Sequence, residues 1–156
     1  MIQYIASDVD GTLLHGHATT LNPELFDIIR QLKERGIHFI AASGRQYENL
    51  RHLFAPVKDD ISYVAENGSM CVHDDKIVSL GHIDTDLIYE IADAAKEYGH
   101  CHTLISTART GYTDSQDPDY IDHIHNDVRI RHRAEHLRCG TRFIENIADD
   151  HFGLLL

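Results

Sequence analysis

The sequence is poor in basic residues and contains no long apolar run. Lysine and arginine number 14 against 25 aspartates and glutamates, which gives a net charge of −11. This excess of acidic residues disfavours broad binding to nucleic acid or to an anionic membrane surface. No apolar stretch approaches the ~20 residues that span a bilayer. We therefore expect neither a nucleic acid nor a membrane as a partner.

Targeting signals and disulfide patterns are also missing. The first residues, MIQYIASDVD, carry neither a basic segment nor a small-residue cleavage site, so we expect no signal peptide. Cys71, Cys101 and Cys139 are scattered and odd in number, which is typical of reduced thiols. The composition, 42% hydrophobic and 25% charged, is that of a folded globular protein. Together these features predict a cytoplasmic protein.

The first half of the chain alternates between strand-like and helix-like patterns. We expect strands at 2–7, 37–43 and 61–67, helices at 22–35 and 45–54, and a hairpin over 69–80 that turns at Asp74-Asp75. In the first helix, Leu25, Ile28, Ile29 and Leu32 fall on one face. The strand–helix alternation predicts an α/β fold, with a parallel sheet covered by helices.

The pattern changes near residues 81–84, where we place a boundary between residues 1–82 and residues 83–156. A helix is expected at 84–98, with Leu87, Ile88, Ile91, Ala95 and Tyr98 facing the core. A strand at 101–107, a short helix at 117–125 capped by Asp117 and a strand at 152–156 complete the expected elements.

Polar residues follow each of the first three strands. Asp8 and Asp10 follow the first strand, Ser43-Gly44 follows the second, and Glu66-Asn67-Gly68 follows the third. Ligands of open parallel sheets bind beyond the carboxyl ends of the strands, so these groups should meet at one edge. Two neighbouring acids repel each other, and a hard cation such as Mg²⁺ would relieve that repulsion. One carboxylate could then act as a nucleophile and the other as an acid and base.

Three segments together carry a family resemblance. DVDGTLL at 8–14, AASGR at 41–45 and VAENGSMCVHDDKIV at 64–78 resemble the haloacid dehalogenase-like hydrolases, in particular their Cof-type branch with a type IIB cap. The resemblance implies a partial Rossmann-like sheet with helices on both faces, followed by part of an α+β cap domain. It also implies a Mg²⁺-dependent phosphatase of small phosphomonoesters, of sugar phosphate or nucleotide type.

The resemblance also implies roles for individual residues. Asp8 would be the nucleophile and a metal ligand, and Asp10 would be the acid and base and a metal ligand through its carbonyl oxygen. The phosphoryl group would be bound by Gly11, Thr12, Ser43 and Gly44. Arg45 and Asn67 are candidates for substrate contact, although Arg45 in the first turn of a helix could equally face solvent.

Two features of the family are not found in the sequence. Family members carry a lysine and a further acidic motif after the cap, whereas the lysines here are Lys33, Lys58, Lys76 and Lys96. The acidic segment IADDH at 147–151 is a weak match because no strand–helix pattern precedes it. We expect a fragment or a shortened relative that is weak or inactive as an enzyme. A homo-oligomer would cover the open sheet edge.

Other interpretations remain open. The chain could be a non-catalytic module that binds phosphate, metal or a partner. A phospho-receiver domain would carry an aspartate where Asn67 lies. A transition-metal site could involve HCH at 100–102, HIH at 123–125 or the group His132, His136 and Cys139, although surface histidines explain these better. The five arginines between 129 and 142 could contact a phosphorylated substrate or pair with nearby aspartates.

Overall fold

A computed structural model describes residues 2–16, 18–106, 111–113 and 115–126. The chain divides into two compact units, Met1–Ser79 and Leu80–Leu156, each of which is considered by itself. Within the described ranges, no helix is both long and apolar enough to cross a membrane. The strand expected at 152–156, the IADDH segment, the arginines beyond residue 128 and the group His132, His136 and Cys139 lie outside the described residues.

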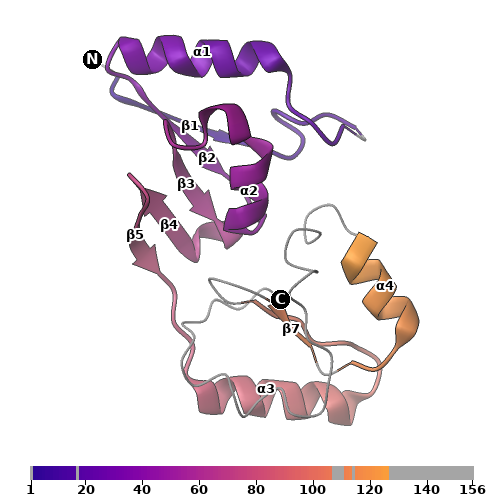
Figure 1. The fold of residues 1–156 in the computed structure, drawn as a ribbon. Helices are drawn as coiled ribbons and strands as arrows, with labels where there is room; N and C mark the ends of the chain where they lie inside the picture. Colours follow the sequence, from indigo (N-terminus) through magenta and orange to yellow (C-terminus); the bar gives the residue numbers. More distant parts are fainter. Residues whose placement is uncertain (1, 17, 107–110, 114, 127–156) are drawn as a thin grey trace. The chain divides into compact units, whose positions relative to one another are not determined.

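The first unit is built on a five-stranded sheet with strands in the order β1-β2-β3-β4-β5 (Figure 1). The strands are β1 (Tyr4–Asp8), β2 (His38–Ala42), β3 (Ser62–Ala65), β4 (Met70–His73) and β5 (Lys76–Leu80). β1, β2 and β3 are parallel, and β4 runs antiparallel to β3. The α/β class is thus confirmed, with a sheet that is mixed because of the expected β4–β5 hairpin.

Two helices connect the parallel strands, α1 (Pro23–Glu34) and α2 (Tyr47–Leu53). α1 begins as expected, because Asn22 caps it by accepting a hydrogen bond from the Glu24 N–H at 3.0 Å and Pro23 occupies the first turn. Right-handed crossovers between strands in the order 1-2-3 place both helices on the same face. The sequence predicted helices on both faces of the sheet. The two helices described in this unit, α1 and α2, cover one face.

The core of the unit lies between that face and the helices. Phe39 and Ala41 of β2 are buried, whereas their neighbours Ile40 and Ala42 are half-buried, as expected for alternation along a strand. The ring of Phe39 packs on that of Phe54, at the end of α2, with 6.2 Å between centroids. This contact packs the end of α2 against β2.

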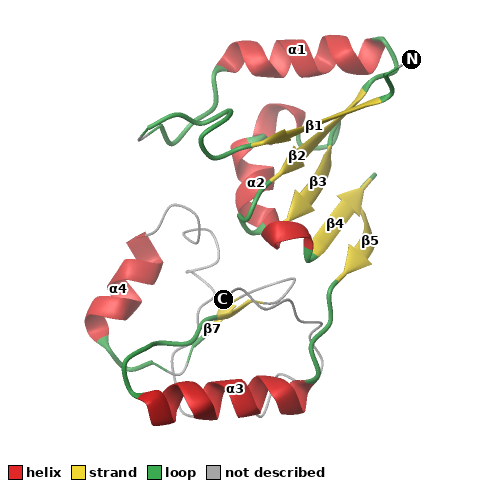
Figure 2. Ribbon diagram, turned by 180° about the vertical axis from the view of Figure 1, so that it is seen from behind, coloured by secondary structure: helices red, strands yellow, loops and turns green. Residues whose placement is uncertain are grey.

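Two short helical turns interrupt the connections, η1 (Ala55–Val57) and η2 (Glu66–Gly68). Figure 2 shows η2 as the red turn between β3 and β4. η2 contains left-handed backbone at Glu66 and Asn67, with φ of 53° and 55°. Such values are uncommon outside glycine, so this turn is a strained point directly after β3.

The second unit contains α3 (Thr85–Tyr98), β6 (Ile105–Ser106), β7 (Gly111–Tyr112) and α4 (Pro118–Asn126). α3 ends at Gly99, whose φ of 73° suits a C-terminal glycine. Asp117 caps α4 as expected, because its carboxylate accepts a hydrogen bond from the Asp119 N–H at 2.9 Å. The strand expected at 101–107 is confirmed over two residues of β6.

Candidate functional site

Three loops meet at the carboxyl edge of the parallel strands, as the sequence predicted. The Ser43 hydroxyl donates to Asp10 Oδ2 at 3.2 Å, which links the loops after β1 and β2. The Glu66 N–H donates to the Arg45 carbonyl at 2.9 Å and the Asn67 N–H to the Ser43 carbonyl at 3.3 Å. These backbone bonds hold the loops after β2 and β3 together without depending on side chains.

The turn after β1 separates the two aspartates from the core. Val9 is fully buried, and its carbonyl accepts hydrogen bonds from the N–H groups of Leu13 and Leu14 at 2.9 and 2.8 Å. Asp8 and Asp10, on either side of Val9, are exposed. The alternation of exposed, buried and exposed residues therefore keeps both carboxylates at the surface of the sheet edge.

Gly11 contributes to this turn through its backbone conformation. Its φ of 83° lies in the region that favours glycine, and its N–H donates to the Leu14 carbonyl at 2.8 Å. The Gly11 N–H is thus already engaged. Any contribution of Gly11 to an anion site would come from shaping the turn rather than from its own donor.

Asp8 and Asp10 lie in different electrostatic surroundings. Asp8 Oδ2 accepts a hydrogen bond from the Thr12 hydroxyl at 3.3 Å, close to the end of the exposed strand β1. Asp10, by contrast, pairs with the Arg45 guanidinium: Nη2 lies 2.7 Å from Oδ1 and Nε lies 2.9 Å from Oδ2. The repulsion between the two acids is therefore offset within the protein by one arginine.

Arg45 is a buried cation with a second anchor. Its side chain is 8% exposed, whereas that of Asp10 is 48% exposed. The guanidinium Nη1 donates to Asn49 Oδ1 at 2.9 Å, and Asn49 is itself buried on α2. Arg45 thus faces Asp10 and the protein interior, and does not project into solvent.

Gly44 and Asn67 lie in close contact. A Cβ atom placed on Gly44 would lie 2.7 Å from Asn67 Oδ1, which is shorter than any ordinary contact. Ser43 is buried, whereas Gly44 and Asn67 are exposed at the rim of the site. The absence of a Cβ at Gly44 therefore leaves room for the end of the Asn67 side chain on the neighbouring loop.

Sequence reasoning missed one buried polar residue beside this edge, Asn49, and it placed Glu66 there without predicting its burial. Asn49 is 5% exposed and Glu66 is 3% exposed. The sequence predicted a helix from residue 45, but α2 begins at Tyr47, so Arg45 precedes it and the four-residue spacing to Asn49 is not a spacing within the helix. For Glu66 the signal was the acidic residue directly before Asn67-Gly68, at the end of a buried strand.

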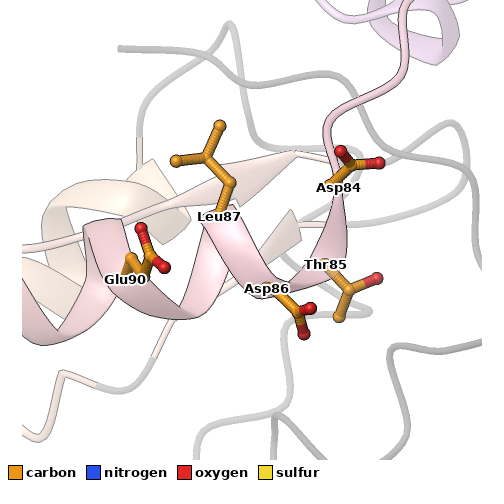
Figure 3. Close-up of a pocket in the computed structure, with 5 residues that line it drawn as sticks. All are labelled: Asp84, Thr85, Asp86, Leu87 and Glu90. Atoms are coloured by element: carbon orange, nitrogen blue, oxygen red, sulfur yellow. The ribbon is translucent and has the colours of Figure 1, made fainter.

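The second unit has an open pocket at the start of α3 (Figure 3). It is lined by Asp84, Thr85, Asp86, Leu87 and Glu90. Figure 3 shows that the three carboxylates point in different directions and do not converge. Because the lining is acidic, the pocket disfavours an anionic ligand such as a phosphate.

The described histidines form no transition-metal site. No group of three or more histidine, cysteine or acidic side chains could hold a metal ion within the described residues. His102, from the HCH segment, stacks on Tyr120 with 4.2 Å between centroids and lies 2.9 Å from the Ser115 hydroxyl through Nδ1. Its role in the described part of the chain is packing against α4.

Comparison with known proteins agrees with the fold. The family model for haloacid dehalogenase-like hydrolases matches residues 5–148. A structure from Eubacterium rectale aligns with a TM-score of 0.79 and 24% identity, covering 96% of this chain and 55% of that one. At this identity the likeness supports the fold alone.

Two curated relatives are phosphatases. The chain is 35% identical over 92 residues to the Escherichia coli 5-amino-6-(5-phospho-D-ribitylamino)uracil phosphatase YbjI, covering 59% of this chain and 34% of that protein. It is 33% identical over 78 residues to a phosphoglycolate phosphatase of Sulfolobus acidocaldarius, covering 49% of this chain and 34% of that protein. The chain therefore spans about a third of the length of each of these relatives.

Proposed function

The chain belongs to the haloacid dehalogenase-like hydrolase family, and on this basis we propose that it acts in a Mg²⁺-dependent phosphatase of small phosphomonoesters. The observation that carries the proposal is the contrast between two aspartates at one sheet edge. Asp8 is exposed beside a hydroxyl, and Asp10 is paired with Arg45. Two carboxylates in unlike surroundings suit a division of work between a nucleophile and a proton carrier.

Asp8 is the proposed nucleophile. A carboxylate oxygen of Asp8 attacks phosphorus, the bond between phosphorus and the ester oxygen breaks, and the alcohol leaves with a proton supplied by Asp10, which must enter this step in its protonated form. Water then attacks the aspartyl phosphate and transfers a proton to Asp10. This step releases inorganic phosphate and restores the Asp8 carboxylate.

The neighbouring loops would hold the phosphoryl group. The Ser43 hydroxyl and the backbone around Gly44 lie at the same edge as the two aspartates, and Thr12 already contacts Asp8. Asn67 lies next to Gly44 and could contact the substrate from the third loop. Arg45 is engaged with Asp10 and Asn49, so we assign it to holding Asp10 rather than to direct substrate contact.

The donor atoms of this edge fit Mg²⁺. This cation prefers oxygen ligands and is commonly held by one or two carboxylates together with water and phosphate oxygens. The exposed Asp8 carboxylate and the Asp10 carbonyl would hold it, since the Asp10 carboxylate is paired with Arg45. When bound, Mg²⁺ would supply positive charge to the transferring phosphoryl group.

The second unit is proposed to be part of the cap that selects the substrate. The names of the two curated relatives indicate a phosphorylated sugar alcohol derivative and a small phosphorylated acid as substrates of those proteins. For this chain we propose the shared class, a small phosphomonoester. The lysine and the further acidic motif that the resemblance implies were not found in the sequence, so we propose slow turnover by this chain alone.

The test is hydrolysis of p-nitrophenyl phosphate with and without Mg²⁺. We expect slow turnover that requires Mg²⁺ and disappears in Asp8→Asn, while Asp10→Asn is slower by about 10²–10⁴-fold, the usual contribution of acid–base catalysis. Asp27→Asn, which alters an exposed aspartate on α1, is the control and should keep full activity. Turnover that persists in Asp8→Asn would refute the assignment. Binding of Mg²⁺ and phosphate by calorimetry without turnover would instead support a non-catalytic module.

A further inference from the structure

The Arg45 guanidinium uses different nitrogens for two different partners. Nε and Nη2 form one edge of the planar group, and both contact the Asp10 carboxylate at 2.7–3.1 Å. Nη1, on the remaining corner, donates to Asn49 Oδ1 at 2.9 Å. Because the group is planar, a contact on that corner constrains the direction in which the edge points.

Asn49 is an unusual residue for its place. It lies on α2 at 5% exposure, although asparagine is a poor helix former and a buried amide is costly unless it is hydrogen-bonded. Arg45 lies in the loop just before α2, and its side chain reaches Asn49 in the first turn of the helix. The contact with Arg45 gives this buried amide oxygen a charged donor.

We propose that Asn49 is a positioning residue that orients Arg45, and through it Asp10, for proton transfer. The inference rests on the proposed function, because Asp10 is the proton carrier only in that reaction. Asn49 itself contacts neither the substrate nor the reacting atoms. Without an acceptor at Nη1, the long arginine side chain can rotate away from the two-point contact, and the half-exposed Asp10 carboxylate then loses its fixed direction.

Two variants of similar shape separate positioning from packing. Asn49→Leu fills the same space without an acceptor, whereas Asn49→Asp keeps an oxygen at the same place. With p-nitrophenyl phosphate and Mg²⁺, we expect Asn49→Leu to lower kcat at least about tenfold, part of the ~10²–10⁴-fold that acid–base catalysis supplies, with KM unchanged within twofold. Asn49→Asp should keep kcat within about threefold of the unsubstituted protein, because the acceptor is retained.

A second measurement does not depend on activity. In ¹⁵N-arginine spectra of the unsubstituted protein, we expect a resolved, slowly exchanging Arg45 Nε–H signal and restricted rotation of Nη1. Both should persist in Asn49→Asp and disappear in Asn49→Leu, with Arg45→Lys identifying the signal. If the unsubstituted protein shows no turnover, the proposed function fails and these spectra still decide the orienting role.

If the spectra of the unsubstituted protein show one averaged signal for the two Nη1 hydrogens, Nη1 rotates freely and the inference is wrong. This measurement decides the question even if Asn49→Leu does not fold. A folded Asn49→Leu with the kcat and the Arg45 signal of the unsubstituted protein would overturn it as well. Equal losses in the leucine and aspartate variants would mean that packing, rather than the acceptor, is what Asn49 provides.

Discussion

At the scale of single residues, the two aspartates are tolerated for a reason that the sequence did not make evident. The expectation was that a divalent cation offsets the repulsion between Asp8 and Asp10. In the structure, Arg45 contacts the Asp10 carboxylate with two nitrogens and already supplies one positive charge. With both carboxylates ionised, Asp8, Asp10 and Arg45 together carry a net charge of −1. They still attract a cation, but more weakly than two carboxylates without the arginine would.

Gly44 offers a direct test of the contact between two loops of the site. A Cβ at this position would lie 2.7 Å from Asn67 Oδ1, so Gly44→Ala must displace the Asn67 side chain. We expect a loss of about 1 kcal/mol in the free energy of unfolding, at the low end for overpacking because the displaced atom ends a side chain. Urea unfolding of the variant measures the loss.

Asn67→Gly provides the matched background for that substitution. It removes the clashing side chain and suits the φ of 55° at this position. The cost of Gly44→Ala should therefore shrink when Asn67 is glycine, giving a nonzero coupling in a double-mutant cycle. Equal costs in the two backgrounds would show that Asn67 is not the obstacle.

Asp8, Asp10 and Ser43 could be placed from the sequence because each directly follows a strand whose apolar pattern is clear. Glu66 could be placed in the same way, directly after β3, but its burial, like that of Asn49 on α2, depends on tertiary contacts that no local pattern encodes. For Arg45 the sequence left substrate contact and solvent exposure equally open. Its pairing with Asp10 spans 35 residues and becomes visible only once the strands are aligned.

At the scale of elements, the expected helices formed, but the residues on their buried faces were predicted less well. In α1, Ile29 is 1% exposed as expected, whereas Ile28, placed on the same face, is 53% exposed. In α3, Ile88 is buried, but Tyr98 is 70% exposed although it was expected to face the core. Periodicity locates the centre of an apolar stripe, while its flanks depend on what packs against them.

Arg51 joins three elements of the first unit. Its guanidinium contacts the Tyr47 hydroxyl at 3.2 Å, Asp59 before β3 at 2.9 Å and Asp75 in the hairpin turn at 2.7 Å. The arginine side chain is 20% exposed and both carboxylates are more than half exposed, so each ion pair is partly screened. The network nevertheless ties α2 to the segment before β3 and to the turn between β4 and β5.

We expect Arg51→Met to lower the free energy of unfolding by about 1 kcal/mol, because two partly exposed pairs are lost while the apolar stem is kept. Arg30→Met is the comparison, since Arg30 has one exposed carboxylate partner, Asp27, besides a hydrogen bond to the Pro56 carbonyl at 3.1 Å. Urea unfolding in low salt and in 1 M NaCl should show a smaller Arg51→Met effect at high salt. If Arg51→Met lowers the free energy of unfolding equally at low and high salt, the loss arises from packing of the arginine side chain and not from its ion pairs.

At the scale of the whole molecule, the acidic composition and the 13 histidines predict a stability that changes near neutral pH. One cluster of histidines lies at the amino end of the parallel strands: the Ser62 hydroxyl lies 2.7 Å from His38 Nε2 and 2.7 Å from His73 Nδ1. The two imidazole rings are 5.0 Å apart, so a positive charge on both is unfavourable.

Burial lowers the pKa of His38 below its ordinary value of 6.5, and the charges of His73 and Lys33 lower it further, while Asp74 opposes them. The unfolded chain therefore binds a proton at His38 at a higher pH than the folded chain does. The stabilising contribution is complete above about pH 6.5 and is lost as the pH falls from there through the lower pKa of the folded state. Urea unfolding between pH 5 and pH 7 should thus show a free energy of unfolding that decreases toward acid.

Substitution identifies the group responsible. His38→Gln, which cannot take up the proton, should flatten the decrease between pH 5 and pH 7, and His82→Gln is the comparison, since His82 lies outside the cluster in an exposed segment. The His38 C–H signal, followed by NMR against pH, should titrate below the value of an exposed histidine. A His38 titration at or above 6.5, or a slope that survives His38→Gln, would show that the acid sensitivity of the molecule arises elsewhere.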